Sequence, residues 1–155
     1  MKKAALTLIA VGVLVIAAGQ IYLAWQPEPA APVVANGTTL RSTEGGDVIG
    51  FIDQFGARSW LGVAFAEPPV GQLRWRAPQP PIPSVDTQQA LRPGALCPQF
   101  ASLLSGAGEA ATQGQITGDE DCLYLNIWSP PNATKLPVML WVHGGGNTIG
   151  HGGSY

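Results

Sequence analysis

The sequence predicts a strand-and-loop portion of a domain with few long helices, preceded by an apolar amino-terminal segment. The chain of 155 residues contains 14 prolines and 20 glycines, which interrupt helices and the interiors of strands. Its apolar residues beyond position 37 come in short runs separated by turn-forming residues, a pattern typical of strands. The length suits one ordinary domain, and the core is small because the amino-terminal segment does not belong to it.

Composition and charge exclude several classes of function. Only 12% of the residues are charged and the formal net charge is -2, so the chain has no basic field that would attract phosphates. We therefore expect no nucleic-acid partner. The two histidines and two cysteines show no clustered metal-ligand spacing, so we expect no metal site.

The amino terminus has the features of an export signal. Lys2 and Lys3 precede an apolar run over 4–18, as in the charged and hydrophobic regions of a secretory signal. Small residues follow that would permit cleavage, but the apolar character resumes, and the run over 4–25 reaches the roughly 20 residues needed to cross a bilayer. Residues 1–25 are therefore either a cleaved signal peptide or a signal-anchor helix. Both interpretations place the main domain outside the cytoplasm, secreted or periplasmic in one case and membrane-anchored in the other.

A linker separates this segment from the folded domain. Residues 26–36 combine Pro27, Pro29 and Pro32 with small residues, a composition that stays extended and exposed. We expect the folded domain to occupy 37–155.

The first strands are predicted near the start of this domain. Two apolar runs, 48–52 and 59–65, flank the polar, glycine-containing segment 53–58, which predicts a β-hairpin. The proline-rich stretch over 66–83 can form neither a helix nor a central strand and is a surface loop. Its tryptophan and alternating arginines favour an ordered loop over a disordered one.

Two further strands are predicted later in the chain. The run over 122–128 alternates weakly, and 138–142 is continuously apolar, which is typical of a strand buried on both faces. The stretch between Cys97 and Cys122 lacks periodicity and is predicted to be a long loop. In an oxidising compartment a disulfide between the two cysteines would close this loop and contribute roughly 3 kcal/mol; two buried free thiols are the alternative.

The segment that carries chemistry begins where 138–142 ends. That apolar run leads directly into His143, Gly144, Gly145 and Gly146, so backbone amides are exposed with no side chains to obstruct them. Glycine permits the backbone dihedral angles and close approach that such a loop needs. Ester hydrolysis builds negative charge on a carbonyl oxygen, and each amide aimed at that oxygen contributes about 3 kcal/mol. The pattern favours an oxyanion hole.

Three motifs in order carry a family resemblance. Residues 65–75 read FAEPPVGQLRW, residues 120–128 read EDCLYLNIW, and the glycine loop follows a strand as in the lipases and esterases of the α/β-hydrolase fold. Together they resemble the type-B carboxylesterases, the cholinesterase-like branch of that fold, over roughly 37–155. The resemblance implies the α/β class and an α/β-hydrolase fold, with only its amino-terminal strands and oxyanion-hole loop present. It also implies a small-molecule carboxylic ester as substrate and no cofactor.

The resemblance assigns roles to individual residues of the glycine loop. Gly145 and Gly146 match the glycines whose amides provide two of the three oxyanion-hole donors, and Gly144 and His143 support them. The third donor follows the nucleophile and is not in this chain. Asn147 departs from the aromatic residue usual after the glycines, which leaves the shape of the acyl pocket open.

The resemblance also implies structural pairs. Cys97 and Cys122 match the family's first disulfide. Arg74 and Glu120 match a buried ion pair, for which loss of one partner is expected to cost about 3 to 5 kcal/mol because a charge is left unpaired.

The catalytic residues of the fold are a serine on a G-x-S-x-G turn, an acid and a histidine, in that order. The chain contains no such series. Ser154 follows Gly152 and Gly153 without a new strand and is not assigned as the nucleophile, and neither His143 nor His151 is assigned as the base. We expect the full-length protein to hydrolyse esters through an acyl-serine intermediate and this fragment alone to be inactive. A catalytically dead binding or adhesion protein, and a truncated gene product without function, remain alternatives.

Overall fold

The structure is a computed structural model that describes residues 15–16, 19–20, 31–102 and 114–153. The chain divides into two compact units, 1–32 and 33–155. Most of the predicted signal peptide or anchor lies outside the described residues; the four that are described there are helical. In the described ranges, the structure contains no helix of the length and apolarity that a membrane span requires. Residues 31–36, the described end of the predicted linker, form no helix or strand.

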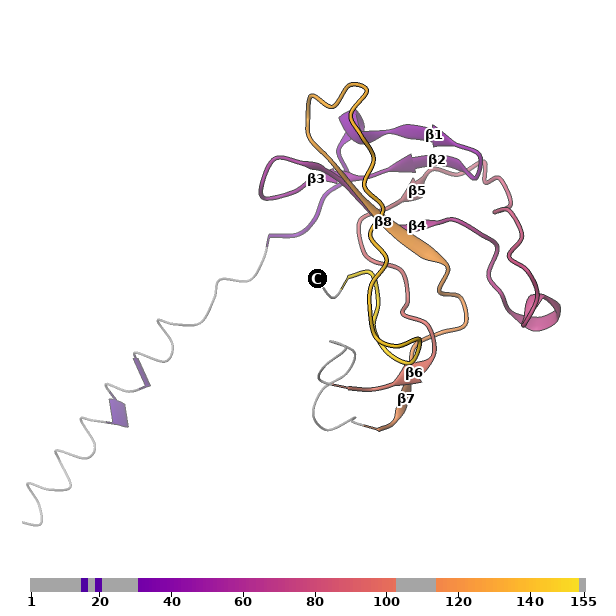
Figure 1. Ribbon diagram of the computed structural model, residues 1–155. Coiled ribbons are helices and arrows are strands. Elements are labelled where there is room, and N and C mark those ends of the chain that lie inside the picture. Colours follow the sequence, from indigo (N-terminus) through magenta and orange to yellow (C-terminus); the bar gives the residue numbers. More distant parts are fainter. Residues whose placement is uncertain (1–14, 17–18, 21–30, 103–113, 154–155) are drawn as a thin grey trace, which may run out of the picture. The chain divides into compact units, whose positions relative to one another are not determined.

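The second unit begins with a small mixed sheet (Figure 1). A 3-10 helix, η1 (Gly37–Thr39), leads into β1 (Arg41–Thr43) and β2 (Gly46–Ile49), which pair antiparallel. The third strand, β5 (Gln88–Gln89), pairs with β2 in parallel, so the strand order is β1-β2-β5.

The second sheet contains the predicted hairpin. β3 (Phe51–Ile52) and β4 (Arg58–Ala64) pair antiparallel, and β8 (Tyr124–Ser129) pairs with the other side of β4. The turn between β3 and β4 is held by Asp53, whose Oδ1 accepts the amides of Phe55 and Ala57, both at 2.9 Å. The hairpin is confirmed, and so is the strand predicted over 122–128.

The first apolar run is split between the two sheets. Its two halves, in β2 and β3, are separated by Gly50, which has no room for a side chain because a Cβ there would overlap the carbonyl oxygen of Ser59. The chain changes sheets at this glycine, which an apolar run alone does not reveal.

The proline-rich loop is ordered, as predicted. It contains the 3-10 helix η2 (Gly71–Leu73) and is closed by a hydrogen bond of 2.9 Å from the Glu67 amide to the Gln79 carbonyl. At its far end the Ser84 amide donates to the Gly45 carbonyl at 3.0 Å, which ties the loop to the turn between β1 and β2.

The cysteine-bounded stretch, predicted as a loop, contains a short antiparallel pair. β6 (Gln99–Phe100) pairs with β7 (Ile116–Thr117), and the residues between them include 103–113, which lie outside the described residues. Strands of two residues are too short to produce a readable hydrophobic period, so the sequence did not predict them.

The core is small and lies where the two sheets meet. It consists of Val48, Trp60, Val63 and Ala90, with Leu125 packed against it. The indole of Trp60 donates to the Thr39 carbonyl at 2.8 Å, so the largest core side chain has its polar atom satisfied.

The strand predicted over 138–142 is not formed, and the prediction that it is buried is wrong for this structure. Residues 136–144 have no regular secondary structure, and Val138 and Met139 are 95% and 91% exposed. A strand that is apolar on both faces requires neighbouring strands and covering layers. In the described part of the chain no strand pairs with this segment. The segment therefore exposes its apolar side chains.

Candidate functional site

The glycine loop folds back on itself immediately after this apolar segment. The carbonyl oxygen of Gly145 accepts three hydrogen bonds: the Thr148 amide at 3.1 Å, the Thr148 hydroxyl at 3.0 Å and the Ile149 amide at 3.2 Å. One carbonyl thus holds the whole turn. Because the peptide unit is planar and trans, the amide of Gly146, which shares that unit, points away from these donors.

The preceding peptide unit is held in a similar way. His143 Nδ1 lies 2.8 Å from the Gly144 carbonyl oxygen. Since a carbonyl only accepts, Nδ1 carries the proton in this contact. The amide of Gly145 belongs to the same peptide unit and points in the opposite direction. The two predicted supporting residues therefore contact each other: the His143 side chain holds the Gly144 carbonyl, on the opposite side of the peptide unit from the Gly145 amide.

The amides of Gly145 and Gly146 are available to a ligand. Both residues are exposed, and among the described residues neither amide has a hydrogen-bond acceptor. Gly145 has φ 122° and Gly146 has φ 62°, values that favour glycine. A Cβ on Gly145 would overlap the Ile149 carbonyl oxygen, whereas one on Gly146 would meet open space. Successive free amides on a turn can donate hydrogen bonds to an anion.

Two carboxamide side chains hold the residues that follow the loop. Gln99, on β6, donates from Nε2 to the Gly150 carbonyl at 3.0 Å and accepts the Gly150 amide on Oε1 at 2.8 Å. Asn126, on β8, donates from Nδ2 to the Gly152 carbonyl at 3.3 Å. Neither residue was predicted from the sequence. The only available signal was that each carboxamide lies close to a predicted disulfide cysteine.

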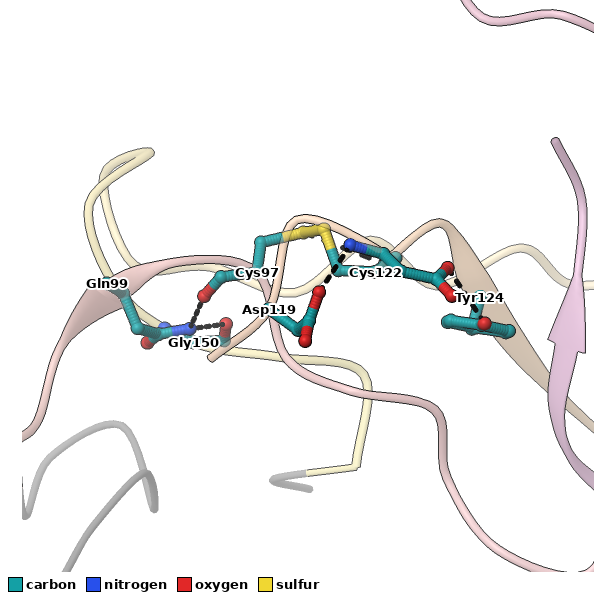
Figure 2. Close-up of a disulfide and its surroundings, with 7 residues drawn as sticks. Cys97, Gln99, Asp119, Cys122, Tyr124 and Gly150 are labelled. Atoms are coloured by element: carbon teal, nitrogen blue, oxygen red, sulfur yellow. Dashed lines mark hydrogen bonds between the residues drawn. A yellow bond between two sulfur atoms is a disulfide. The ribbon is translucent and has the colours of Figure 1, made fainter. Parts of the chain in front are cut away.

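The predicted disulfide is present. Cys97 and Cys122 are joined with a Cα–Cα distance of 5.0 Å, and no described cysteine is free. The alternative of two free thiols is therefore wrong for this structure. Figure 2 shows the disulfide with Gln99 and Gly150 on one side and Tyr124 on the other. The crosslink lies two residues before Gln99, so it connects to the contacts that hold the glycine loop.

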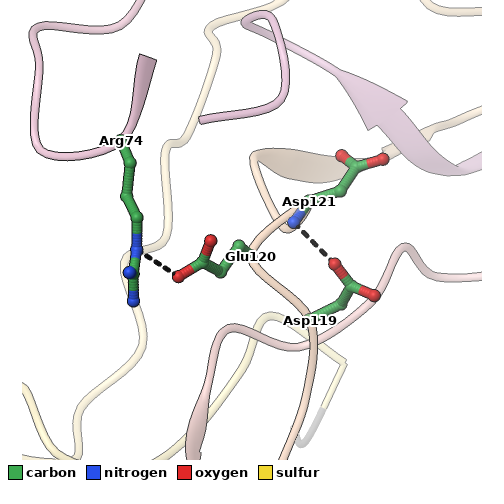
Figure 3. A network of polar contacts seen from close by, with 4 residues as sticks. All are labelled: Arg74, Asp119, Glu120 and Asp121. Carbon is green, nitrogen blue, oxygen red and sulfur yellow. Dashed lines mark hydrogen bonds and ion pairs between the residues drawn. The ribbon is translucent and has the colours of Figure 1, made fainter. Parts of the chain in front are cut away.

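The predicted ion pair forms, but it is not buried. Arg74 Nε lies 2.5 Å from Glu120 Oε1, and the two side chains are 54% and 37% exposed (Figure 3). Beside it the Asp121 amide donates to Asp119 Oδ1 at 2.9 Å, which shapes the turn that presents Glu120. Solvent screens an exposed pair, so the pair contributes less than the buried pair that the resemblance implied.

Tyr124 adjoins the same turn. Its hydroxyl donates to Asp121 Oδ1 at 2.8 Å. Burial raises the pKa of Tyr124 to about 12, and the hydrogen bond and negative charge of Asp121 act in the same direction, as does the charge of Asp119. The phenol therefore stays protonated and acts as a structural donor. Ser154, the serine that follows the loop, lies outside the described residues.

Comparisons with known proteins agree on one family. The Carboxylesterase family matches residues 37–155. The para-nitrobenzyl esterase of Bacillus subtilis (strain 168) is 42% identical over 113 residues, covering 72% of this chain and 22% of that protein. The fumonisin B1 esterase of Sphingopyxis macrogoltabida is 41% identical over 126 residues, covering 80% and 22%.

Solved structures give the same result. A PNB esterase structure matches with a TM-score of 0.64 at 37% identity, covering 76% of this chain and 23% of that one. A second, titled thermophylic PNB esterase, matches with a TM-score of 0.65 at the same identity. The chain thus spans about a fifth of the length of these relatives, which share the predicted α/β-hydrolase fold. The predicted fold class is confirmed, with this chain forming a strand-rich part of it.

Proposed function

Because this chain belongs to the carboxylesterase family, we propose that the protein hydrolyses small-molecule carboxylic esters and that this chain supplies its oxyanion-hole loop. The free amides of Gly145 and Gly146 carry the proposal. Both are exposed, adjacent and without an acceptor in the described chain, while the carbonyls of their peptide units are held by other residues.

The chemistry requires donors that are already in place. When a serine hydroxyl attacks an ester carbonyl, the carbonyl oxygen becomes an alkoxide, and the alcohol then leaves to give an acyl-serine that water hydrolyses. Donors fixed before reaction stabilise that alkoxide with no reorganisation, and removal of one typically costs about 3 kcal/mol of activation free energy. Two such donors would come from this loop. The serine, acid, histidine and third donor are proposed to come from other parts of the protein.

We propose that this reaction takes place outside the cytoplasm. Disulfides form and persist in oxidising compartments, and the Cys97–Cys122 crosslink is compatible with that location. The lysines and apolar run at the amino terminus would provide export, either as a cleaved signal or as an anchor.

The test uses the protein encoded by the complete reading frame that contains these residues. We expect it to release p-nitrophenolate from p-nitrophenyl butyrate and to be labelled covalently by a fluorophosphonate probe, which reacts with activated serines. The 155-residue chain alone is expected to do neither. A correctly folded full-length protein without turnover or labelling on a panel of acyl chain lengths contradicts the proposal. Labelling of the isolated chain contradicts the placement of the nucleophile elsewhere.

A further inference from the structure

Gln99 makes an unusual set of contacts with the end of the glycine loop. Its side-chain amide pairs with both backbone groups of Gly150, and Nε2 also donates to the carbonyl of its near neighbour Cys97 at 3.1 Å (Figure 2). Only 9% of the residue is exposed. A buried carboxamide with its donor and acceptor both used is fixed in one orientation. Gln99 and Gly150 are 51 residues apart in the sequence, so the contact joins two separate segments.

Gly150 lies against the part of the loop that precedes the proposed oxyanion-hole donors. It has φ 106°, and a Cβ on it would lie 2.8 Å from the Gly144 carbonyl oxygen and 2.9 Å from His143 Nδ1. The bare Gly150 backbone therefore packs directly against the Gly144 peptide unit. That unit includes the amide of Gly145, so the position of Gly150 limits the direction in which this amide points.

We infer that Gln99 is a positioning residue for the oxyanion hole: it fixes Gly150, and Gly150 supports the peptide unit that presents the Gly145 amide. The inference rests on the proposed function. Oxyanion stabilisation depends on donors held within a few tenths of an ångström, and a displacement of about 1 Å costs on the order of 100-fold in rate. Gln99 acts through the backbone and needs no contact with the substrate.

The test compares two substitutions of glutamine by methionine in the full-length protein. Gln99→Met keeps the length of the side chain but removes all three hydrogen bonds. Gln115→Met is the control, because Gln115 lies in the same disulfide-bounded segment, is exposed and makes no side-chain hydrogen bond in the described chain. We expect Gln99→Met to lower kcat by about 10- to 100-fold while KM changes less than about threefold, the signature of a contribution made only in the transition state. Gln115→Met should match the wild type.

A trifluoromethyl ketone inhibitor separates positioning from general damage. Its adduct with serine carries an oxyanion, so its affinity should fall in parallel with kcat/KM in Gln99→Met, whereas the affinity of a non-hydrolysable amide analogue of the substrate should not. If Gln99→Met does not fold, Gln99→Glu replaces it. This variant keeps an acceptor for the Gly150 amide but lacks the donor, and the same pattern is expected. Unchanged kcat and inhibitor affinity in a folded variant overturn the inference.

The two proposals fail in different ways. A wild-type protein without esterase activity refutes the proposed function. Hydrogen exchange then still tests whether Gln99 holds Gly150. Exchange of the Gly150 amide should accelerate at least about tenfold in Gln99→Met and not in Gln115→Met, because the hydrogen bond to Gln99 protects that amide. An active wild type whose Gln99→Met variant shows wild-type exchange and kinetics refutes the positioning role alone.

Discussion

The side chain of Asn126 accepts the backbone amide of Gly62 at 2.9 Å, where the register between β4 and β8 shifts. Gly62 has φ 73° and sits in a bulge, so its amide has no partner in the regular ladder of the sheet. The carboxamide replaces that partner. Its other end reaches Gly152, so one side chain connects a sheet irregularity to the segment after the glycine loop.

Replacing Asn126 should therefore destabilise the protein, and the loss should be larger when the Gly62 amide is left without a hydrogen-bond acceptor. Asn126→Leu strands the Gly62 amide and should lower the free energy of unfolding by about 1 to 3 kcal/mol. Asn126→Asp keeps the acceptor and should cost less. Urea unfolding measures both, with Asn132→Leu as the control because Asn132 is exposed and makes no side-chain hydrogen bond among the described residues. Equal stability of Asn126→Leu and Asn132→Leu contradicts the role.

Gly146 allows a clean test of the oxyanion donors. Gly146→Ala and Gly56→Ala both introduce a Cβ at a positive φ, 62° and 77°, with no atom close by, so their backbone cost is the same in kind. Alanine keeps the backbone amide at 146, but its methyl group occupies the open space beside the proposed donor, where a substrate oxygen would approach. We therefore expect Gly146→Ala to lower kcat by up to about 100-fold, the scale on which one oxyanion-hole donor contributes, and Gly56→Ala to leave it unchanged. Steady-state kinetics, corrected for the folded fraction of each variant, measure this difference in kcat. Equal kcat values for the two variants would contradict a role of the loop in catalysis.

The disulfide should be a major source of stability. It closes 25 residues of sequence, for which the loop-entropy relation gives about 3 to 4 kcal/mol. Cys97→Ser combined with Cys122→Ser should lower the free energy of unfolding by about that amount in chemical denaturation. Reduction of the wild type should give the same curve, and a double variant as stable as the oxidised protein would contradict the prediction.

The sequence predicted elements whose signal is local and missed relationships between distant segments. The β3–β4 hairpin has apolar runs on both sides of a polar turn, and the structure forms it. The apolar run over 138–142 has the composition of a buried strand, but composition does not supply neighbours, and the segment is exposed. Gln99 lies 51 residues before its partner Gly150, and Asn126 lies 26 residues before its partner Gly152. No periodicity encodes such pairs, so they emerge only from the fold.

The exposure of the ion pair between Arg74 and Glu120 also could not be predicted from the sequence. The charges of Arg74 and Glu120 follow from residue identity, and the resemblance implied their pairing, but burial depends on what covers them. With side chains 54% and 37% exposed, the pair should contribute between about 0 and 1 kcal/mol. We expect Arg74→Ala to destabilise this chain by no more than that, compared by thermal unfolding with Arg76→Ala, whose arginine is exposed. A loss of several kcal/mol would show that the pair is desolvated in solution.

Tyr124 gives a prediction at alkaline pH. Burial first, then the hydrogen bond to Asp121, raise the pKa of this phenol from 10.0 to about 12. Because the folded state holds the proton more tightly than the unfolded state, the resulting stabilisation is complete below pH 10 and is lost as the pH rises towards 12. Wild type should therefore lose more stability over this range than Tyr124→Phe, which has no phenol to ionise. The difference in ultraviolet phenolate absorbance between these two proteins should show a midpoint near 12, and Asp121→Asn should lower that midpoint, because it removes the charge that opposes ionisation. A midpoint at the ordinary tyrosine value would mean that the contact with Asp121 does not persist in solution.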